Sequence, residues 1–166
     1  DLEIAAWFHD TGFINVAENH EKESARIASK FLQTNNVAQQ RIDAISTLIL
    51  ATKAGHQPKN DSEKIIMDAD CAHLASKSFF EYTSLLRKEW ELTGCKKVSD
   101  IDWIKENITF FSEQHQFYTE FAIKNWTKRK EKNLSKLIKS LKTTKENNKK
   151  FNQKAEALSL KKQKGN

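Results

Sequence analysis

The sequence predicts an all-α fold, a helical bundle followed by a basic C-terminal helix and tail. Gly and Pro contribute only four and one of the 166 residues, too few for the many turns of a β-sandwich or barrel. Apolar residues recur at helical spacing over most of residues 1–126, which is typical of amphipathic helices. The charge is uneven: residues 1–127 carry fourteen basic and nineteen acidic side chains (net −5), and residues 128–166 carry fourteen basic and three acidic (net +11).

The length suits one domain with a core large enough to need no disulfide. No apolar run approaches the ~18 residues of a membrane span, and the opening Asp1-Leu2-Glu3 is unlike a secretory signal. The two cysteines, Cys71 and Cys95, have no metal-type spacing and suit a reducing compartment. We therefore expect a cytoplasmic protein, with Cys71 in the core and Cys95 at the surface.

Apolar spacing and end signals predict each helix of the bundle in turn. The run from Leu2 to Phe8 that leads to Gly12 predicts the last turns of a buried helix. Asn19 is expected to cap a second helix that ends near Leu32. A third helix is predicted over residues 41–52, because Ile42, Ile45, Leu48 and Ile49 share one helix face. Further helices are predicted over residues 61–74, 79–92, 101–111 and 115–126.

The Lys-rich C-terminal segment is expected to add one more amphipathic helix. Residues 127–144 contain the apolar stripe Leu134, Leu137, Ile138 and Leu141, and beyond Thr144 we expect a basic linker or tail. Nucleic-acid binding is the alternative for this tail. We do not expect nucleic acid as a partner, because few aromatic residues are interleaved for base stacking.

A His-Asp doublet, His9-Asp10, ends the first apolar helix. Two ionisable groups at the end of a core helix are costly unless they are paired or bind a metal. An imidazole and an adjacent carboxylate, ~100° apart on a helix, can both reach one crevice and ligate a divalent cation. The alternative is a buried His-Asp pair that only caps the helix.

Two further carboxylates, Asp68 and Asp70, lie in the apolar helix over residues 61–74. Side chains two positions apart on a helix point ~200° apart, so they cannot easily serve one metal. We expect one of them to be a ligand and the other a partner, a cap or half of an internal salt bridge.

These segments together resemble the HD superfamily of metal-dependent phosphohydrolases. The resemblance rests on AAWFHDTGF at residues 5–13, on NHE at residues 19–21 with Ser24, on LILATK at residues 48–53 and on DAD at residues 68–70. It covers roughly residues 1–126. Residues 85–89, Phe110-Phe111 and His115 also resemble a branch of the superfamily in which a Lys-rich segment joins the HD domain to a membrane-embedded effector domain.

The resemblance implies one divalent metal ion (Mg, Mn, Fe, Ni or Zn) held by His9, Asp10 and Asp70. We assign the last ligand to Asp70 rather than Asp68. The family's first metal His belongs to a helix before residue 1, so we expect this chain to supply three of the usual four protein ligands. Thr52 and Lys53 stand where two-metal members carry paired His, which implies a single ion.

The resemblance also implies hydrolysis of a small phosphate ester, with a nucleotide as the favoured substrate. The ion would polarise a phosphoryl oxygen and activate water, His20 or Glu21 would act as general acid or base, and Lys53 would offset phosphate charge. The alternative is a non-catalytic nucleotide-sensing domain that relays binding to an attached domain, including one in a membrane. A helical interaction module with a vestigial site is a third hypothesis. The sequence predicts no oligomeric state.

Overall fold

The computed structural model describes residues 1–94 and 96–164, with side chains through Lys154. Cys95, expected at the surface, lies outside the described residues. The helices in chain order are α1 (Leu2–Phe8), η1 (Thr11–Ile14), α2 (His20–Thr34), α3 (Gln39–Ala51), α4 (Asp61–Asp70), η2 (Cys71–Ala75), α5 (Phe79–Leu92), α6 (Asp100–Thr109), η3 (Phe110–Gln114) and α7 (Glu120–Lys164). The described residues form no strand, so the predicted all-α fold is confirmed.

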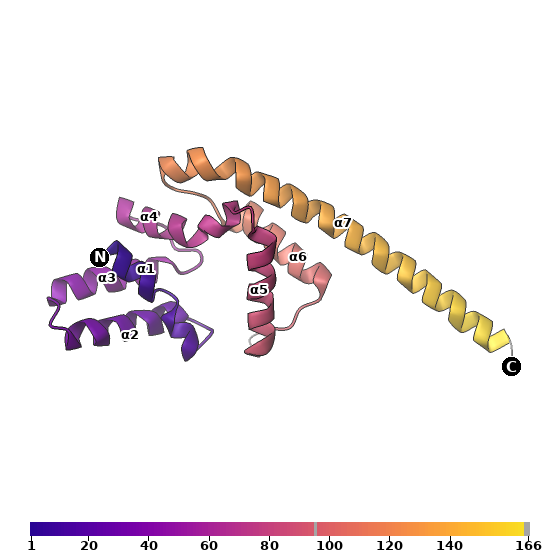
Figure 1. The fold of residues 1–166 in the computed structure, drawn as a ribbon, viewed down its shortest axis with the longest axis horizontal. Helices are drawn as coiled ribbons and strands as arrows, with labels where there is room; N and C mark the ends of the chain where they lie inside the picture. The colour runs from indigo at the N-terminus through magenta and orange to yellow at the C-terminus, as the bar shows by residue number, and fades with distance from the viewer. Residues whose placement is uncertain (95, 165–166) are drawn as a thin grey trace.

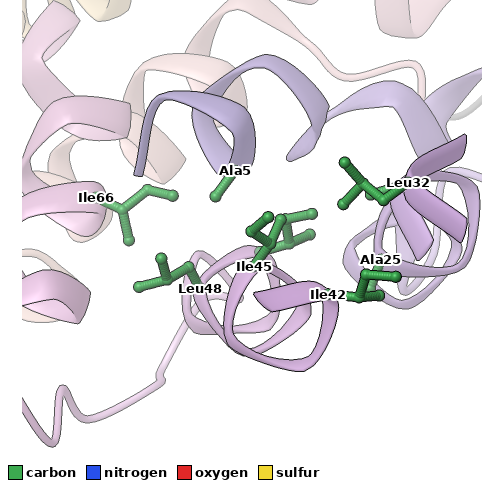
Figure 2. Packing of buried hydrophobic residues seen from close by; sticks show 9 residues of the cluster. Ala5, Ala25, Leu32, Ile42, Ile45, Leu48 and Ile66 are labelled. Carbon is green, nitrogen blue, oxygen red and sulfur yellow. The ribbon is translucent and has the colours of Figure 1, made fainter. Parts of the chain in front are cut away.

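The first core lies between helices α1 to α4. Ile42, Ile45 and Ile49 on one face of α3 are at most 1% exposed, and they pack against α1, α2 and α4 (Figure 2). Ala5 of α1 and Ala28 of α2 are fully buried, and such small side chains let the helix axes approach closely. Burying each isoleucine contributes roughly 1.5–3 kcal/mol, so this face of α3 holds the first four helices together.

The second core joins η2, α5, η3 and α7. Phe79 and Phe111 meet edge to face with ring centroids 4.9 Å apart, and Leu74 and Leu137 complete this buried cluster. Figure 1 shows α4 and η2 leading from the first group of helices to the second. Helix α4 therefore contributes to the first core through Ile66 and continues directly into η2, part of the second.

Several helix ends differ from the prediction. Helix α1 ends at Phe8 rather than Gly12, because the chain turns at His9 and Asp10 and continues as the short 3-10 helix η1. The predicted helix over residues 115–126 begins only at Glu120. Residues 115–118 form no regular secondary structure, and the backbone N–H groups of Tyr118 and Thr119 donate to the Asp68 carboxylate.

Helix α7 is one 45-residue helix, so the boundaries predicted at residues 126/127 and 144/145 both fall inside it. Thr144 is the last partly buried residue of α7 among the described side chains, and every described side chain from Lys145 to Lys154 is exposed. In Figure 1 this helix projects away from the body. Thr144 thus marks the point where the helix leaves the body, and the expected linker is helical as far as Lys164.

Helix α7 does not meet the requirements of a membrane span. Among the described residues, none of the helices offers an apolar stretch long enough to cross a bilayer.

Candidate metal centre

The first core places His9 and Asp70 beside each other. Ala5 of α1 and Ile66 of α4 both belong to this core. His9 and Asp70 each follow one of these anchors by four residues, so each side chain lies about one turn further along the same helix face. His9 Nε2 consequently lies 3.3 Å from an Asp70 carboxylate oxygen. The predicted convergence of His9, Asp10 and Asp70 agrees with this geometry, since Asp10 Oδ2 lies 3.2 Å from the same nitrogen.

The other ring nitrogen of His9 fixes the orientation of the imidazole. Nδ1 lies 2.8 Å from the Ala6 carbonyl oxygen, a geometry in which Nδ1–H donates and Nε2 is directed at the two carboxylates. Histidines that ligate metals commonly use their second nitrogen in this way. His9 is therefore oriented as a metal ligand would be, with Nε2 as the ligating atom.

The carboxylates of Asp10 and Asp70 strongly favour a positive charge beside His9 Nε2. Hydrogen bonds to Asp10 and then to Asp70 raise the pKa of His9 to about 10. Burial opposes ionisation of Asp10, but its hydrogen bond with His9 prevails and the pKa of Asp10 is lowered. A proton held on Nε2 is thus a positive charge between two carboxylates, at the place where a divalent ion would share the same three groups.

A second histidine lies on the other side of Asp10. His20 begins α2, and its Nε2 is 3.4 Å from Asp10 Oδ1 and 3.8 Å from Glu21 Oε1. Asp10 thus presents one carboxylate oxygen to each of His9 and His20. The Glu21 side chain is only 9% exposed, and its Oε2 has no hydrogen-bond partner among the described residues.

The short helix η1 holds His20 against the His-Asp doublet, a contact that the sequence analysis missed. The backbone N–H of Gly12 donates to Ser24 Oγ at 2.8 Å in a buried hydrogen bond. A Cβ on Gly12 would overlap the His20 carbonyl oxygen and lie 2.7 Å from the Ser24 nitrogen. Gly12 is therefore needed for close packing of η1 on α2. Gly12 in the AAWFHDTGF motif is the signal in the sequence from which this contact could have been predicted.

Phe13, the next residue of η1, stacks on the His20 ring. Their centroids are 3.7 Å apart and the planes differ by 19°. The contact between His20 Nδ1 and the Ala17 carbonyl oxygen is long for a hydrogen bond, at 3.4 Å. Stacking on Phe13 is therefore the main restraint on the plane of the imidazole ring. No periodic signal in the sequence indicates this contact, because it depends on the turn at His9 and Asp10.

Lys53 approaches the site through Asn19. Its ammonium group donates to Asn19 Oδ1 at 2.8 Å, and Asn19 immediately precedes His20. The expected side-chain cap by Asn19 is wrong. Asn19 occupies the cap position, but its left-handed conformation (φ 56°) comes with no side-chain cap bond, whereas capping side chains usually extend from the β region.

Asp68 lies away from the His-Asp doublet and holds the start of α7. Its two oxygens accept hydrogen bonds from the N–H groups of Tyr118 and Thr119 and from the Thr119 hydroxyl, at 2.7–2.9 Å. Three donors satisfy this buried carboxylate, and no Lys or Arg among the described residues pairs with it. Asp70, on the opposite side of the helix, is the carboxylate that faces His9, as the angular offset between the two predicts.

The donor set suits a divalent ion in its chemistry, and two of its donor pairs have a suitable spacing. Bonds of ~2.0–2.2 Å to a shared ion put neighbouring donor atoms roughly 3.0–3.5 Å apart, and the His9–Asp10 and His9–Asp70 distances of 3.2 and 3.3 Å lie in that range. Among the described residues, no group of three or more His, Cys, Asp or Glu side chains is placed so that it could hold a metal ion. The three side chains must therefore reorient to enclose an ion.

No family model, curated protein or solved structure matches the chain. Any conclusion about function therefore rests on the geometry of His9, Asp10, Asp70 and their neighbours.

Proposed function

We propose that the chain is an HD-type metal-dependent phosphohydrolase that acts on a small phosphate ester, with a nucleotide as the favoured substrate. One observation carries the proposal. The Nε2 atom of His9 is directed at two carboxylates, its neighbour Asp10 and Asp70 at the end of α4, at 3.2 and 3.3 Å, beside the apolar core of the first four helices. In a solvated His-Asp pair at the surface, protein groups would not hold both ring nitrogens of the histidine.

His9, Asp10 and Asp70 would hold the ion, and Asp10 would also link it to His20. A divalent ion bound there supplies polarisation of a phosphoryl oxygen and a lowered pKa for a water molecule. The chain's own contribution is to bring one nitrogen and two carboxylates together, since the Ala6 carbonyl orients the His9 ring and the first core positions the helices that carry His9 and Asp70.

His20 and Glu21 are the proposed proton-transfer groups. His20 Nε2 lies 3.4 Å from an Asp10 carboxylate oxygen and 3.8 Å from a Glu21 carboxylate oxygen, so this nitrogen faces both carboxylates. Such a residue acts as general acid or base when its nitrogen reaches the leaving-group oxygen or the attacking water. Phe13 restrains the plane of the ring that must do so.

Lys53 is the proposed phosphate contact. Its ammonium group is a mobile point charge and is held beside His20 by one neutral partner, Asn19. Exchange of that partner for a phosphate oxygen leaves no buried carboxylate unpaired. The net charge of −5 over residues 1–127 disfavours a polyanion as the substrate, and a small phosphate ester needs few cations.

The decisive experiment is turnover by the full chain after chelation and reloading with Mg²⁺, Mn²⁺, Fe²⁺, Ni²⁺ or Zn²⁺. Nucleoside mono-, di- and triphosphates and cyclic nucleotides are offered, and phosphate and nucleoside products are measured. We expect metal-dependent release that Asp70→Asn abolishes. Asp61→Asn, on the same helix with its side chain 87% exposed, should behave as the parent. Absence of turnover with every ion and substrate would contradict the proposal.

A non-catalytic nucleotide sensor is the second candidate, and one observation favours it. Helix α4 carries Asp70 toward the site and Asp68 toward the start of α7, so a ligand that moves α4 acts on the projecting helix. Such a domain would act in the cytoplasm and relay binding to an attached domain, including one in a membrane. Nucleotide binding without turnover in the experiment above would favour this candidate.

A further inference from the structure

An exposed apolar cleft lies between α4 and the first turns of α7. It has a volume of about 720 Å³, and Ile65, Tyr118, Phe121 and Trp126 supply most of its apolar lining. Phe121 is 63% and Ile65 is 46% exposed, and Phe121 meets Trp126 edge to face at 5.5 Å. Exposed apolar residues that share one cleft are typical of a binding surface, unlike singly scattered ones.

The free part of α7 has the complementary character. Over residues 145–154 it carries four Lys and one Glu, and no side chain in this stretch is buried. Phe151 lies among these lysines and is 72% exposed. A basic helix with an exposed aromatic residue gains most from a surface that is apolar and acidic.

The cleft supplies that acidity. The charged groups that line it are Asp61, Asp68 and Glu120 against Lys64. Asp68 is already occupied by the start of α7, and Lys64 pairs with Asp61 at 2.8 Å. Three carboxylates against one Lys give the cleft lining a formal net charge of −2, and Glu120 is exposed, so it is the carboxylate that can meet a lysine of the free helix.

The free part of α7 cannot fill the cleft of its own chain. Twenty-five residues separate Trp126 from Phe151, and at 1.5 Å per residue a continuous helix places them about 38 Å apart. Figure 1 shows α7 as an extended helix with its first turns against the body and its far end projecting from it. If the free part of an α7 helix fills this cleft, it must therefore come from another molecule.

We propose that residues 145–154 of α7 dock in the α4–α7 cleft of a second copy of this chain. If two copies lie with their α7 helices antiparallel, each supplies a free helix to the other's cleft. The contact is then reciprocal and closes as a two-fold dimer instead of extending into a filament. This arrangement also covers the exposed surface of a helical segment that is marginal in isolation.

The test is sedimentation of the full chain over a concentration series. We expect a monomer–dimer equilibrium whose Kd rises with salt and rises at least about tenfold in both Phe121→Ser (cleft) and Phe151→Asp (free helix). Leu92→Ser, which removes an equally exposed apolar side chain at the end of α5, should not change the Kd. Circular dichroism of each variant verifies that it retains its helices.

Mixing the two defective variants separates this mode from other dimers. A Phe121→Ser chain has an intact free helix and a Phe151→Asp chain has an intact cleft, so the mixture regains one of the two contacts and we expect partial recovery of dimer. A monomer at all concentrations would overturn the proposal. Loss of dimer in Phe151→Asp alone, without recovery on mixing, would also overturn it, because that pattern indicates pairing between the two free helices.

Discussion

His9 Nε2 and Asp70 Oδ1 lie 3.3 Å apart although His9 follows the first helix and Asp70 ends the fourth. Their proximity is a consequence of core packing, because each lies four residues beyond a buried anchor, Ala5 or Ile66. The apolar cluster therefore determines which polar groups meet, and the chemistry of the site depends on the stability of the first four helices.

Removal of Asp10 and removal of Asp68 should have different effects on metal binding. Asp10→Ala should abolish divalent-metal binding in titration calorimetry, since it removes the group shared by His9 and His20. Asp68→Ala should leave the metal affinity nearly unchanged and lower the free energy of unfolding by about 1–3 kcal/mol, because buried N–H groups of Tyr118 and Thr119 lose their acceptor. Equal loss of metal binding in both variants would show that the wrong face of α4 has been assigned.

Gly12 should be intolerant of any side chain. Gly12→Ala puts a methyl group against the His20 carbonyl and the Ser24 backbone, and overpacking of this kind typically costs about 1–3 kcal/mol. Ser24→Ala, which leaves the buried Gly12 N–H without its acceptor and adds no atoms, should also destabilise the fold by about 1–3 kcal/mol, and it measures the share of the contact that the hydrogen bond contributes. Urea denaturation measures both. A Gly12→Ala variant as stable as the parent would disprove the close contact between η1 and α2.

Much of this architecture, but not its contacts, could be predicted from the sequence. Helix α5 spans Phe79–Leu92, as its apolar spacing predicts, and the angular offset between Asp68 and Asp70 agrees with their different partners, His9 for Asp70 and the start of α7 for Asp68. The Gly12–Ser24 bond and the Phe13–His20 stack depend on how η1 meets α2, which no local pattern encodes. The long α7 was missed because its end lacks apolar periodicity, yet no Gly or Pro interrupts residues 95–164, and Lys, Glu and Gln favour helix.

The stability contributed by His9 should depend on pH in the metal-free chain. Its folded-state pKa is raised from 6.5 to about 10, so protonated His9 stabilises the fold fully below about pH 6.5, and this contribution is lost as the pH rises through 10. The difference in Tm between the parent and His9→Gln should therefore be largest near pH 6 and shrink by pH 10.5. A difference that does not change over this range would contradict the ion pairs with Asp10 and Asp70.

Metal binding should show the reverse pH trend. A divalent ion and a proton compete for His9 Nε2, so affinity should increase as the pH rises. Calorimetric titrations of Mn²⁺ at pH 6 and pH 8 measure the change, and His73→Gln, an exposed-face histidine whose Nδ1 contacts only the Asp70 carbonyl oxygen, serves as the control. An affinity independent of pH would indicate that the ion binds without His9.

Phe13 should act on the site through His20. Phe13→Leu removes the stacked ring and keeps an apolar side chain, so we expect a faster carbethoxylation of His20 by diethyl pyrocarbonate, with little change in Tm because Phe13 is 43% exposed. Phe13→Tyr retains the ring and should behave as the parent. Identical His20 reactivity in the parent and both variants would contradict a restraint of the His20 ring by Phe13.

The position of a bound ion is the most direct test of the proposed metal centre. Crystals of the full chain soaked in Mn²⁺ should show an anomalous-scattering peak bounded by His9 Nε2 and the carboxylates of Asp10 and Asp70, with bonds of about 2.0–2.3 Å. Asp70→Asn crystals treated in the same way should show a weaker peak or none. A peak at other residues, or no peak at a concentration that saturates binding in solution, would contradict the proposed metal centre.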